Sequence, residues 1–351
     1  MRRMVPVLLF LCLLAGCGTA PSPVETVSPV YTDWSKLVPR EENGPLYTYF
    51  EPYSGTGPLQ PREDYGPLLP YMGVLFQDYY PLYGLVTTDG QLVTEPVYCY
   101  IRTIDGSSGT SKFLLLSSVE GDPAWFSDNG SVPIWAENCV SVTAAAPDGS
   151  WVVSGDYRAA EQVDDRHLAL YREDSSITIL DDTGSVSAFF PGDTLVQWMG
   201  CGFWFWDDAG SPIVVWRDGF GALYDGIDDA LIGWLDSSTG TISKEAPPGA
   251  SAEGQEDVSA ELPVIDGYRD LYPITDSVTG EVFLLGHRKT DGRWRYDLLD
   301  AQGHLLYPDW HSADYGIAGG LISTLEGDIY AYISLDTGEA AFRYPLRTNS
   351  D

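Results

Sequence analysis

Residues 83–93 read YGLVTTDGQLV, two short apolar runs on either side of a Thr-Asp-Gly turn. An Asp side chain hydrogen-bonds the backbone within a tight turn, and Gly adopts the positive φ that such a turn needs. An Asp-and-Gly turn between apolar runs therefore predicts a β-hairpin. The same pattern recurs at residues 124–132, 177–186, 204–210, 296–306 and 332–338. The sequence predicts an all-β protein built from repeated antiparallel hairpins.

The turn glycines recur at intervals that suit a repeated unit. Gly90 and Gly130 are 40 residues apart, and so are Gly240 and Gly280. The span from Gly90 to Gly338 is 248 residues, or six units of about 41. A unit of roughly 40–45 residues is the length of a four-stranded propeller blade. We therefore predict a six- or seven-bladed β-propeller, with two smaller β domains as the alternative.

Three segments resemble repeats found in known β-repeat families. Residues 83–96 carry an aromatic–Gly pair, a short strand, a Gly turn, a second strand and a Pro, and they resemble a WG repeat with Tyr83 in place of the usual Trp. Residues 296–308 are similar, although Asp297 stands where that repeat has Gly and the Pro comes one position early. Residues 146–155 (APDGSWVVSG) resemble the hairpin of WD-type and TolB-like propeller repeats. The resemblances imply a β-repeat architecture and carry no catalytic residue to this chain.

A few segments depart from the hairpin pattern. Residues 222–235 (ALYDGIDDALIGWL) and 158–167 are candidates for short helices. Residues 40–72 are dense in Pro, Gly and Tyr, which predicts an extended segment on a face or edge of the propeller in place of regular strands. Residues 246–261 contain no aromatic side chain, and we expect them to form an exposed acidic loop.

The charge of the chain excludes whole classes of partner. The 351 residues include 51 acidic and 19 basic side chains, for a net charge of −32. Nucleic-acid binding depends on Lys and Arg displacing counterions from phosphates, so we expect no nucleic-acid partner. Attraction to an anionic membrane surface is excluded for the same reason. The chain is not a disordered polyanion, because 44% of its residues are hydrophobic and 13% are aromatic.

The N-terminus has the features of a secretory signal. Residues 1–17 read MRRMVPVLLFLCLLAGC, with a basic start and an apolar run over residues 5–14. That run is shorter than the roughly 20 residues of a transmembrane helix. The stretch from Leu14 to Cys17 (LAGC) resembles the bacterial lipobox. The resemblance implies cleavage between Gly16 and Cys17 and attachment of lipid to the Cys17 thiol.

These features predict the organisation of the chain. Residues 1–16 form a lipoprotein signal peptide, residues 17–39 carry the lipidated Cys17 and a disordered, flexible tether, and residues 40–351 form the β-repeat domain. The protein is then held at the cell membrane by lipid on Cys17 and faces the extracytoplasmic side. An ordinary signal peptide that happens to contain Cys17 is the alternative.

Motifs for catalysis or cofactor binding are missing from the sequence. It contains no G-x-S-x-G, no H-E-x-x-H and no P-loop, so we predict no enzyme activity and no cofactor. The spacings of Cys99, Cys139 and Cys201 match no metal motif, and these residues allow at most one disulfide bond. The acids in residues 181–184 and 225–229 do not fit a calcium loop, which favours a role in turns and predicts no metal site.

We therefore predict a non-enzymatic binding or scaffold module for a protein or glycan partner. The candidate partner surface consists of Trp204, Trp206, Asp207 and Asp208. The alternatives are a carbohydrate-active hydrolase on a propeller scaffold and a calcium- or solute-binding lipoprotein. A hydrolase requires carboxylates and a base or cation to converge in a central pocket, whereas a binding module does not. The other Trp residues are expected in the core, because side chains alternate along strands.

Overall fold

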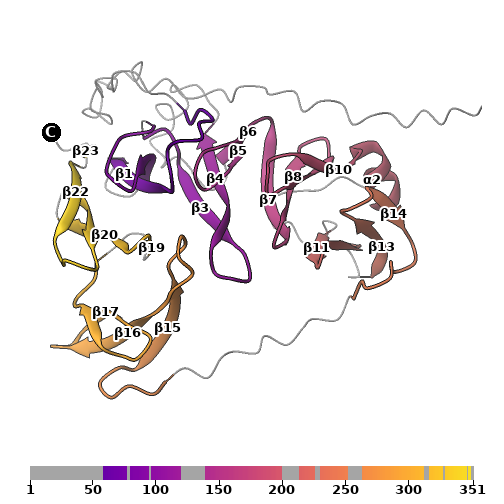
Figure 1. Ribbon diagram of the computed structural model, residues 1–351. Coiled ribbons are helices and arrows are strands. Elements are labelled where there is room, and N and C mark those ends of the chain that lie inside the picture. Colours follow the sequence, from indigo (N-terminus) through magenta and orange to yellow (C-terminus); the bar gives the residue numbers. More distant parts are fainter. Residues whose placement is uncertain are drawn as a thin grey trace, which may run out of the picture.

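The computed structural model describes residues 58–76, 80–94, 96–119, 139–199, 213–225, 230–251, 263–311, 316–326, 329–345 and 347–348. Within these ranges the chain forms strands β1 to β23 and a single helix, α2, and the strands assemble into six sheets (Figure 1). The prediction of an all-β propeller is confirmed, and each sheet is one blade.

Five blades consist of four consecutive antiparallel strands. They are blade 2 (β3 Tyr100–Asp105, β4 Ser111–Val119, β5 Cys139–Ala145, β6 Val152–Val153), blade 3 (β7 Tyr157–Asp164, β8 His167–Arg172, β9 Ile177–Asp181, β10 Val186–Phe190), blade 4 (β11 Ile213–Arg217, β12 Phe220–Tyr224, β13 Leu231–Asp236, β14 Thr241–Ser243), blade 5 (β15 Asp270–Thr275, β16 Val282–Thr290, β17 Arg293–Leu299, β18 Leu305–Tyr307) and blade 6 (β19 Ile317–Ala318, β20 Leu321–Glu326, β21 Ile329–Ser334, β22 Ala340–Pro345).

Blade 1 joins the two ends of the described chain. It contains β1 (Leu68–Phe76) and β2 (Tyr80–Thr87), which pair antiparallel, and the C-terminal strand β23 (Arg347–Thr348). β23 pairs with β1 in parallel, with Arg347 opposite Val74. The C-terminal strand therefore completes the first sheet and brings the two ends of the described chain together.

The core lies between blades and not in one central mass. Leu170 of blade 3 packs in a buried cluster with Phe113 of blade 2, and Ile179 of blade 3 packs with Leu223 of blade 4. Further clusters join blades 1 and 2, blades 1 and 6, and blades 5 and 6. Each blade buries one or both faces against a neighbour, so apolar area is removed from water at every interface.

These contacts order the blades as 4, 3, 2, 1, 6 and 5, and Figure 1 shows them as a curved row whose ends, blades 4 and 5, lie apart. Blade 5 also meets blade 2 across the middle. The N–H of Ser111 donates to the carbonyl of Ser277 at 2.7 Å. Gly109, with φ +74°, lies so close that an added Cβ would be 2.5 Å from the Thr275 methyl group.

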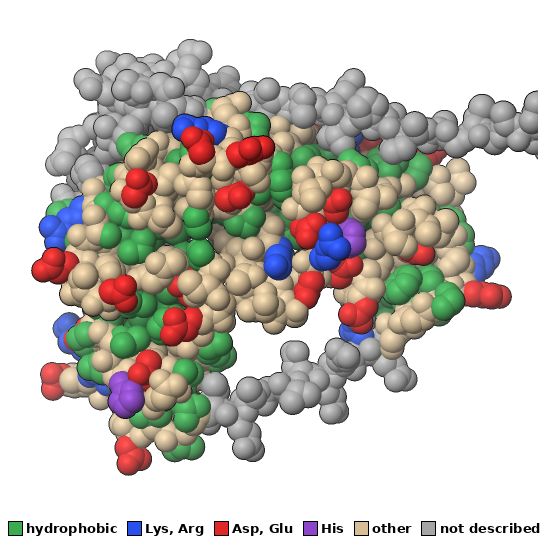
Figure 2. Space-filling model, viewed as in Figure 1, with side chains coloured by type: hydrophobic (Ala, Val, Ile, Leu, Met, Phe, Trp, Pro, Cys, Tyr) green, Lys and Arg blue, Asp and Glu red, His purple; other side chains and the backbone are tan. Residues whose placement is uncertain are grey.

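Asp residues support many of the turns, as the sequence predicted. Oδ1 of Asp181 accepts from the N–H groups of Thr183 and Ser185 at 2.9 and 3.0 Å, and Gly184 takes φ +77°. In the turn between β5 and β6, Asp148 accepts from the N–H of Ser150 at 3.0 Å. Figure 2 shows further Asp and Glu side chains spread over one face of the molecule, where they form a polar coat.

Both helix predictions were wrong. Residues 158–167 form most of β7 and the start of β8, and residues 222–235 contain the end of β12 and most of β13. Pairing with neighbouring strands overrides the weak helix propensity there, since Ala160 lies opposite Leu170 in a buried register. The one helix, α2 (Gly192–Met199), follows Pro191 and has Asp193 in its first turn, where an acid favours a helix start.

The extended segment predicted over residues 40–72 is partly wrong, because β1 begins at Leu68. Residues 58–67 contain no strand, and they lie against blades 1 and 2. There the buried N–H of Leu59 donates to the Tyr98 hydroxyl at 2.9 Å. The acidic loop was expected over residues 246–261. Residues 246–251 contain no strand, and residues 252–261 lie outside the described residues.

Candidate functional site

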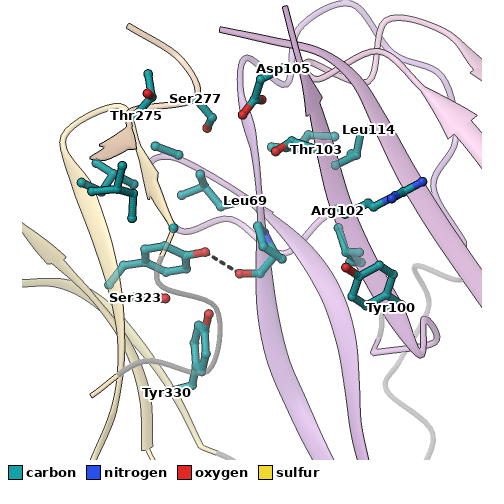
Figure 3. Close-up of a pocket in the computed structure, with 18 of the residues that line it drawn as sticks. Leu69, Tyr100, Arg102, Thr103, Asp105, Leu114, Thr275, Ser277, Ser323 and Tyr330 are labelled. Atoms are coloured by element: carbon teal, nitrogen blue, oxygen red, sulfur yellow. Dashed lines mark hydrogen bonds between the residues drawn. The ribbon is translucent and has the colours of Figure 1, made fainter. Parts of the chain in front are cut away.

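A cavity of about 520 Å³ lies between blades 1, 2, 5 and 6 (Figure 3). Its walls come from β1, β3, β15, β19 and the β20–β21 pair, so two consecutive blades from each half of the described chain contribute to it. The volume falls in the range of about 300–1,000 Å³ that small-molecule sites occupy.

One end of the cavity is rich in small polar side chains. Asp105, Thr275 and Ser277 lie there in Figure 3, beside the contact between the hairpins of blades 2 and 5. The Ser111 hydroxyl donates to Oδ1 of Asp105 at 2.8 Å, and the Ser111 N–H donates to the carbonyl of Ser277. The hairpin contact therefore holds this end in shape.

The other end is aromatic. Tyr100, 53% exposed, and the buried Tyr330 lie at this end in Figure 3, together with Ser323. The ring of Tyr330 meets that of Tyr332 edge-on at 5.7 Å. The Tyr332 hydroxyl donates to the carbonyl of Pro70 in blade 1. These contacts fix two of the three rings, while Tyr100 presents its ring to solvent.

Among the described lining residues, Arg102 carries the one guanidinium and Asp105 the one carboxylate. The Arg102 Nη2 donates to the carbonyl of Ala160 in blade 3 at 2.8 Å, and its side chain points away from the cavity in Figure 3. What the cavity offers a ligand is therefore a set of hydroxyl groups and rings, with the Asp105 carboxylate at the polar end. This arrangement can hydrogen-bond to a polar ligand and stack against its apolar parts.

A carboxyl group with a shifted pKa lies on β7 in blade 3, outside the cavity lining. Glu161 accepts a hydrogen bond from the Tyr171 hydroxyl at 2.7 Å, and Nε1 of Trp216 donates to that same hydroxyl at 2.7 Å. Protein atoms crowd the carboxyl group although part of the side chain meets solvent. This desolvation raises the pKa of Glu161 above its ordinary value, against the opposing effects of the Tyr171 hydrogen bond and the charge of Arg102.

None of the predicted site residues falls in the described part of the chain. Gly16, Cys17, Trp204, Trp206 and the pair Asp207 and Asp208 all lie outside the described residues, as do the signal peptide and the tether. No described helix is long and apolar enough to cross a membrane.

Other predictions about Trp and Cys can be compared with the structure. Trp234 and Trp310 are 4% and 0% exposed, as the core interpretation predicts, but Trp294 is 43% exposed. Cys99 is disulfide-bonded, which answers the question that the sequence left open. In the described residues no group of three or more His, Cys, Asp or Glu side chains could hold a metal ion.

The residues of the cavity were missed by sequence reasoning. Tyr100, Thr275 and Ser323 belong to three different blades, and each sits in an unremarkable strand or strand end. The alternation of side chains gives the face of a blade, but it does not tell which blades meet. A signal for this site would have required knowledge of the contact between blades 2 and 5.

The sequence matches no protein-family model, and it matches no curated protein. Among solved structures the chain is similar to BamB from Moraxella catarrhalis, with 12% identity, a TM-score of 0.25, and 80% of this chain and 90% of that chain covered. It is also similar to apo AztD from Citrobacter koseri, with 11% identity, a TM-score of 0.30, and 81% and 83% covered. The β-propeller domain of Cps50 (Swd1) from Myceliophteria thermophila is also similar, with 12% identity, a TM-score of 0.22, and 70% of each chain covered. The propeller assignment rests on the six sheets themselves.

Proposed function

We propose that the protein is a lipid-anchored, extracytoplasmic binding module that holds a protein or glycan partner at the cavity between blades 1, 2, 5 and 6. The observation that carries the proposal is the lining of that cavity. It combines neutral hydroxyl groups, from Thr103, Thr275 and Ser277 among others, with the exposed ring of Tyr100.

The state of the two charged lining residues supports binding over catalysis. Arg102 is hydrogen-bonded to the carbonyl of Ala160, and Asp105 accepts from the Ser111 hydroxyl. Both groups therefore help to hold the walls in place. Most of the other lining side chains come from strands, which hold them more rigidly than loops do. A preformed site loses less entropy when a partner binds.

The anchor is supported by the sequence at residues 14–17, which resembles a lipobox. A single acyl chain gives marginal membrane binding, and the resemblance implies a diacylglyceryl group on Cys17. With a net charge of −32, the chain has no electrostatic attraction to an anionic bilayer. Lipid on Cys17 then provides the attachment, and the propeller is presented to partners outside the cytoplasm.

Quantitative cross-linking on intact cells tests the binding proposal. The wild-type chain is compared with Thr103→Trp, which fills the cavity from the exposed face of β3, and with Thr241→Trp, an exposed Thr in blade 4, as the matched control. We expect a partner species that is captured by the wild type and by Thr241→Trp and is lost with Thr103→Trp. Equal capture by all three proteins would refute binding at the cavity.

One observation favours a second candidate, a carbohydrate-active hydrolase. The raised pKa of Glu161 is a property that a general acid needs, and the charge of Arg102, a residue that lines the cavity, acts on this carboxyl group. Hydrolysis of a panel of nitrophenyl glycosides by the wild type, abolished in Glu161→Gln and retained in Thr241→Trp, would establish this function. An absence of turnover in the wild type would count against it.

A further inference from the structure

Basic side chains gather in blade 5 of this acidic protein. Five of the 19 Lys and Arg residues of the chain lie between positions 269 and 295: Arg269, Arg288, Lys289, Arg293 and Arg295. Arg288 and Arg295 are ion-paired with acids of the same blade. The other three lie at the end of blade 5 where β16 turns into β17, which Figure 1 shows at the lower left of the molecule.

Aromatic side chains occupy the same end of the blade, on one face of the sheet. The strand register places His287 opposite Tyr296 and Lys289 opposite Trp294. The His287 ring stacks on that of Tyr296 at 4.5 Å and lies 4.3 Å from that of Trp294. Tyr272 of β15 lies opposite Leu285 of β16. Leu285 and His287 are two residues apart on that strand, so their side chains, and that of Tyr272, point to the same face.

The face is open to solvent at this end, whereas its other end, with Phe283 and Leu298, packs on blade 6. Trp294 is 43% exposed and Tyr272 is 49% exposed, and no other Trp in the described ranges is exposed. We call the surface formed by Arg269, Tyr272, His287, Lys289 and Trp294 the aromatic shelf. None of these residues lines the cavity between blades 1, 2, 5 and 6.

Two cations lie over the ring of the exposed Trp294. The guanidinium of Arg269 lies 5.1 Å from the centre of the Trp294 ring, and Nζ of Lys289 lies 5.7 Å from it. Asp270 lies 3.5 Å from both the Arg269 Nε and the His287 Nδ1. No described carboxylate pairs with Lys289, so its charge is available to a ligand.

We propose that the aromatic shelf binds an acidic glycan, a sugar chain that carries carboxylate groups. The C–H groups on the face of a sugar ring are weakly positive, and the faces of Trp294 and Tyr272 are negative, so the two stack. Arg269 and Lys289 lie where they can pair with the carboxylates of the same chain. The rest of the surface repels polyanions, which directs such a ligand to this end of blade 5.

A glycan fits the shelf better than an acidic peptide does. A protein interface surrounds its anchor residues with apolar side chains. The exposed rings of the shelf are surrounded instead by the charged side chains of Asp270, Lys289 and Arg269. Exposed rings with polar groups beside them suit a ligand that stacks its own rings on them and forms hydrogen bonds at the edges.

Binding of oligogalacturonate, measured by calorimetry and by Trp fluorescence, tests the proposal. The methyl-esterified oligomer is the neutral probe of equal length, and poly-L-glutamate is the probe that offers charge without sugar rings. We expect the wild type to bind oligogalacturonate in preference to both. Trp294→Ala should weaken binding by about tenfold. Lys289→Gln, a change at an exposed side chain, should weaken it several-fold and reduce its dependence on salt.

The controls separate this proposal from the proposed function of the cavity. Phe189→Ala, which removes an exposed ring of blade 3, should leave oligogalacturonate binding unchanged, and so should the cavity variant Thr103→Trp. Far-UV circular dichroism confirms that each variant folds. The proposal is overturned if the wild type does not bind oligogalacturonate, if Lys289→Gln binds it as the wild type does, or if poly-L-glutamate binds equally well.

Discussion

The buried carboxylate of Asp297 provides a quantitative test of how blade 5 is held together. Its side chain is 2% exposed, and it accepts hydrogen bonds from Nε and Nη2 of Arg288. The Tyr268 hydroxyl and the N–H of Asp309 also donate to it, each at 2.9 Å. Tyr268 belongs to the segment that covers the face of blade 5 away from blade 6. There, a Cβ on Gly286 would lie 2.6 Å from the Tyr268 ring.

Asp297→Ala removes the acceptor of four hydrogen bonds and the partner of a cation. Breaking a buried ion pair from one side costs about 3–5 kcal/mol. Arg288 is 25% exposed and can still pair with Asp309, whose carboxylate lies 3.2 Å away, so we place the loss in unfolding free energy near the lower end, at about 3 kcal/mol. Tyr268→Phe removes one of the four bonds and should cost about 1.5–3 kcal/mol, the range for a hydrogen bond to a charged group.

The same network makes a prediction about pH. Burial opposes ionisation, but Arg288, the N–H of Asp309 and the Tyr268 hydroxyl together hold the pKa of Asp297 below its ordinary value. A carboxyl group with a lowered pKa in the folded state stabilises the protein above its unfolded pKa of about 3.9, and this contribution is lost as the pH falls through the folded pKa. Burial and the bond to Asp297 also raise the pKa of Tyr268 to about 12, so this hydroxyl remains a donor throughout.

Urea unfolding followed by Trp fluorescence measures both effects. The matched control is Asp291→Asn, in the β16–β17 turn, where φ is +52° and Asn tolerates that conformation. We expect the control to stay within about 0.5 kcal/mol of the wild type. The difference between wild type and Asp297→Ala should shrink as the pH falls below about 3.9, the unfolded pKa. An Asp297→Ala protein as stable as the control near pH 7, or a difference that persists unchanged in acid, would refute the reasoning.

Three further predictions concern the anchor and the turns. Metabolic labelling with a palmitate analogue should mark the wild type and not Cys17→Ala, and labelling that survives the substitution would exclude lipid on Cys17. Gly184→Ala should destabilise the chain by about 1–3 kcal/mol in thermal unfolding, because φ is +77° and the new Cβ would lie 2.6 Å from the Trp151 ring. Gly292→Ala, with φ +79° and open space around it, should cost less, and equal losses would show that the Trp151 contact contributes nothing. Asp276→Ala should lower the melting temperature more near pH 7 than near pH 3. Burial raises the pKa of this carboxyl group, but the backbone N–H groups that donate to it, among them those of Gly319 and Gly320, bring the pKa below its ordinary value. An equal loss of melting temperature at the two pH values would contradict this.

Local chemistry explains which parts of the fold could be predicted from the sequence. The turn at Asp181 and Gly184 depends on atoms within five residues, so its residues reveal it without reference to the rest of the chain. Asp297 is a different case. It was visible as the residue that replaces Gly in a segment similar to a WG repeat, but its role depends on Arg288 and Tyr268, which lie on other elements.

Contacts between blades explain what could not be predicted. Residues 158–167 have a moderate helix propensity, and only the strands beside them make them β7. The alternation along β17 places Trp294 and Leu298 on one face, yet Leu298 is buried by blade 6 whereas Trp294 extends beyond it. The cavity was hidden for the same reason, since Tyr100 and Thr275 are brought together by the contact between blades 2 and 5.

The central claim is that a partner binds at the cavity, and a photo-cross-linking residue placed at Tyr100 tests it most directly. Its ring is 53% exposed within the cavity lining, and Phe189, 40% exposed on blade 3, serves as the comparison position. On intact cells we expect one defined adduct from position 100, none of that mass from position 189, and its loss when Thr103→Trp fills the cavity. The same adduct from both positions, or an adduct at position 100 that Thr103→Trp leaves unchanged, would contradict the account.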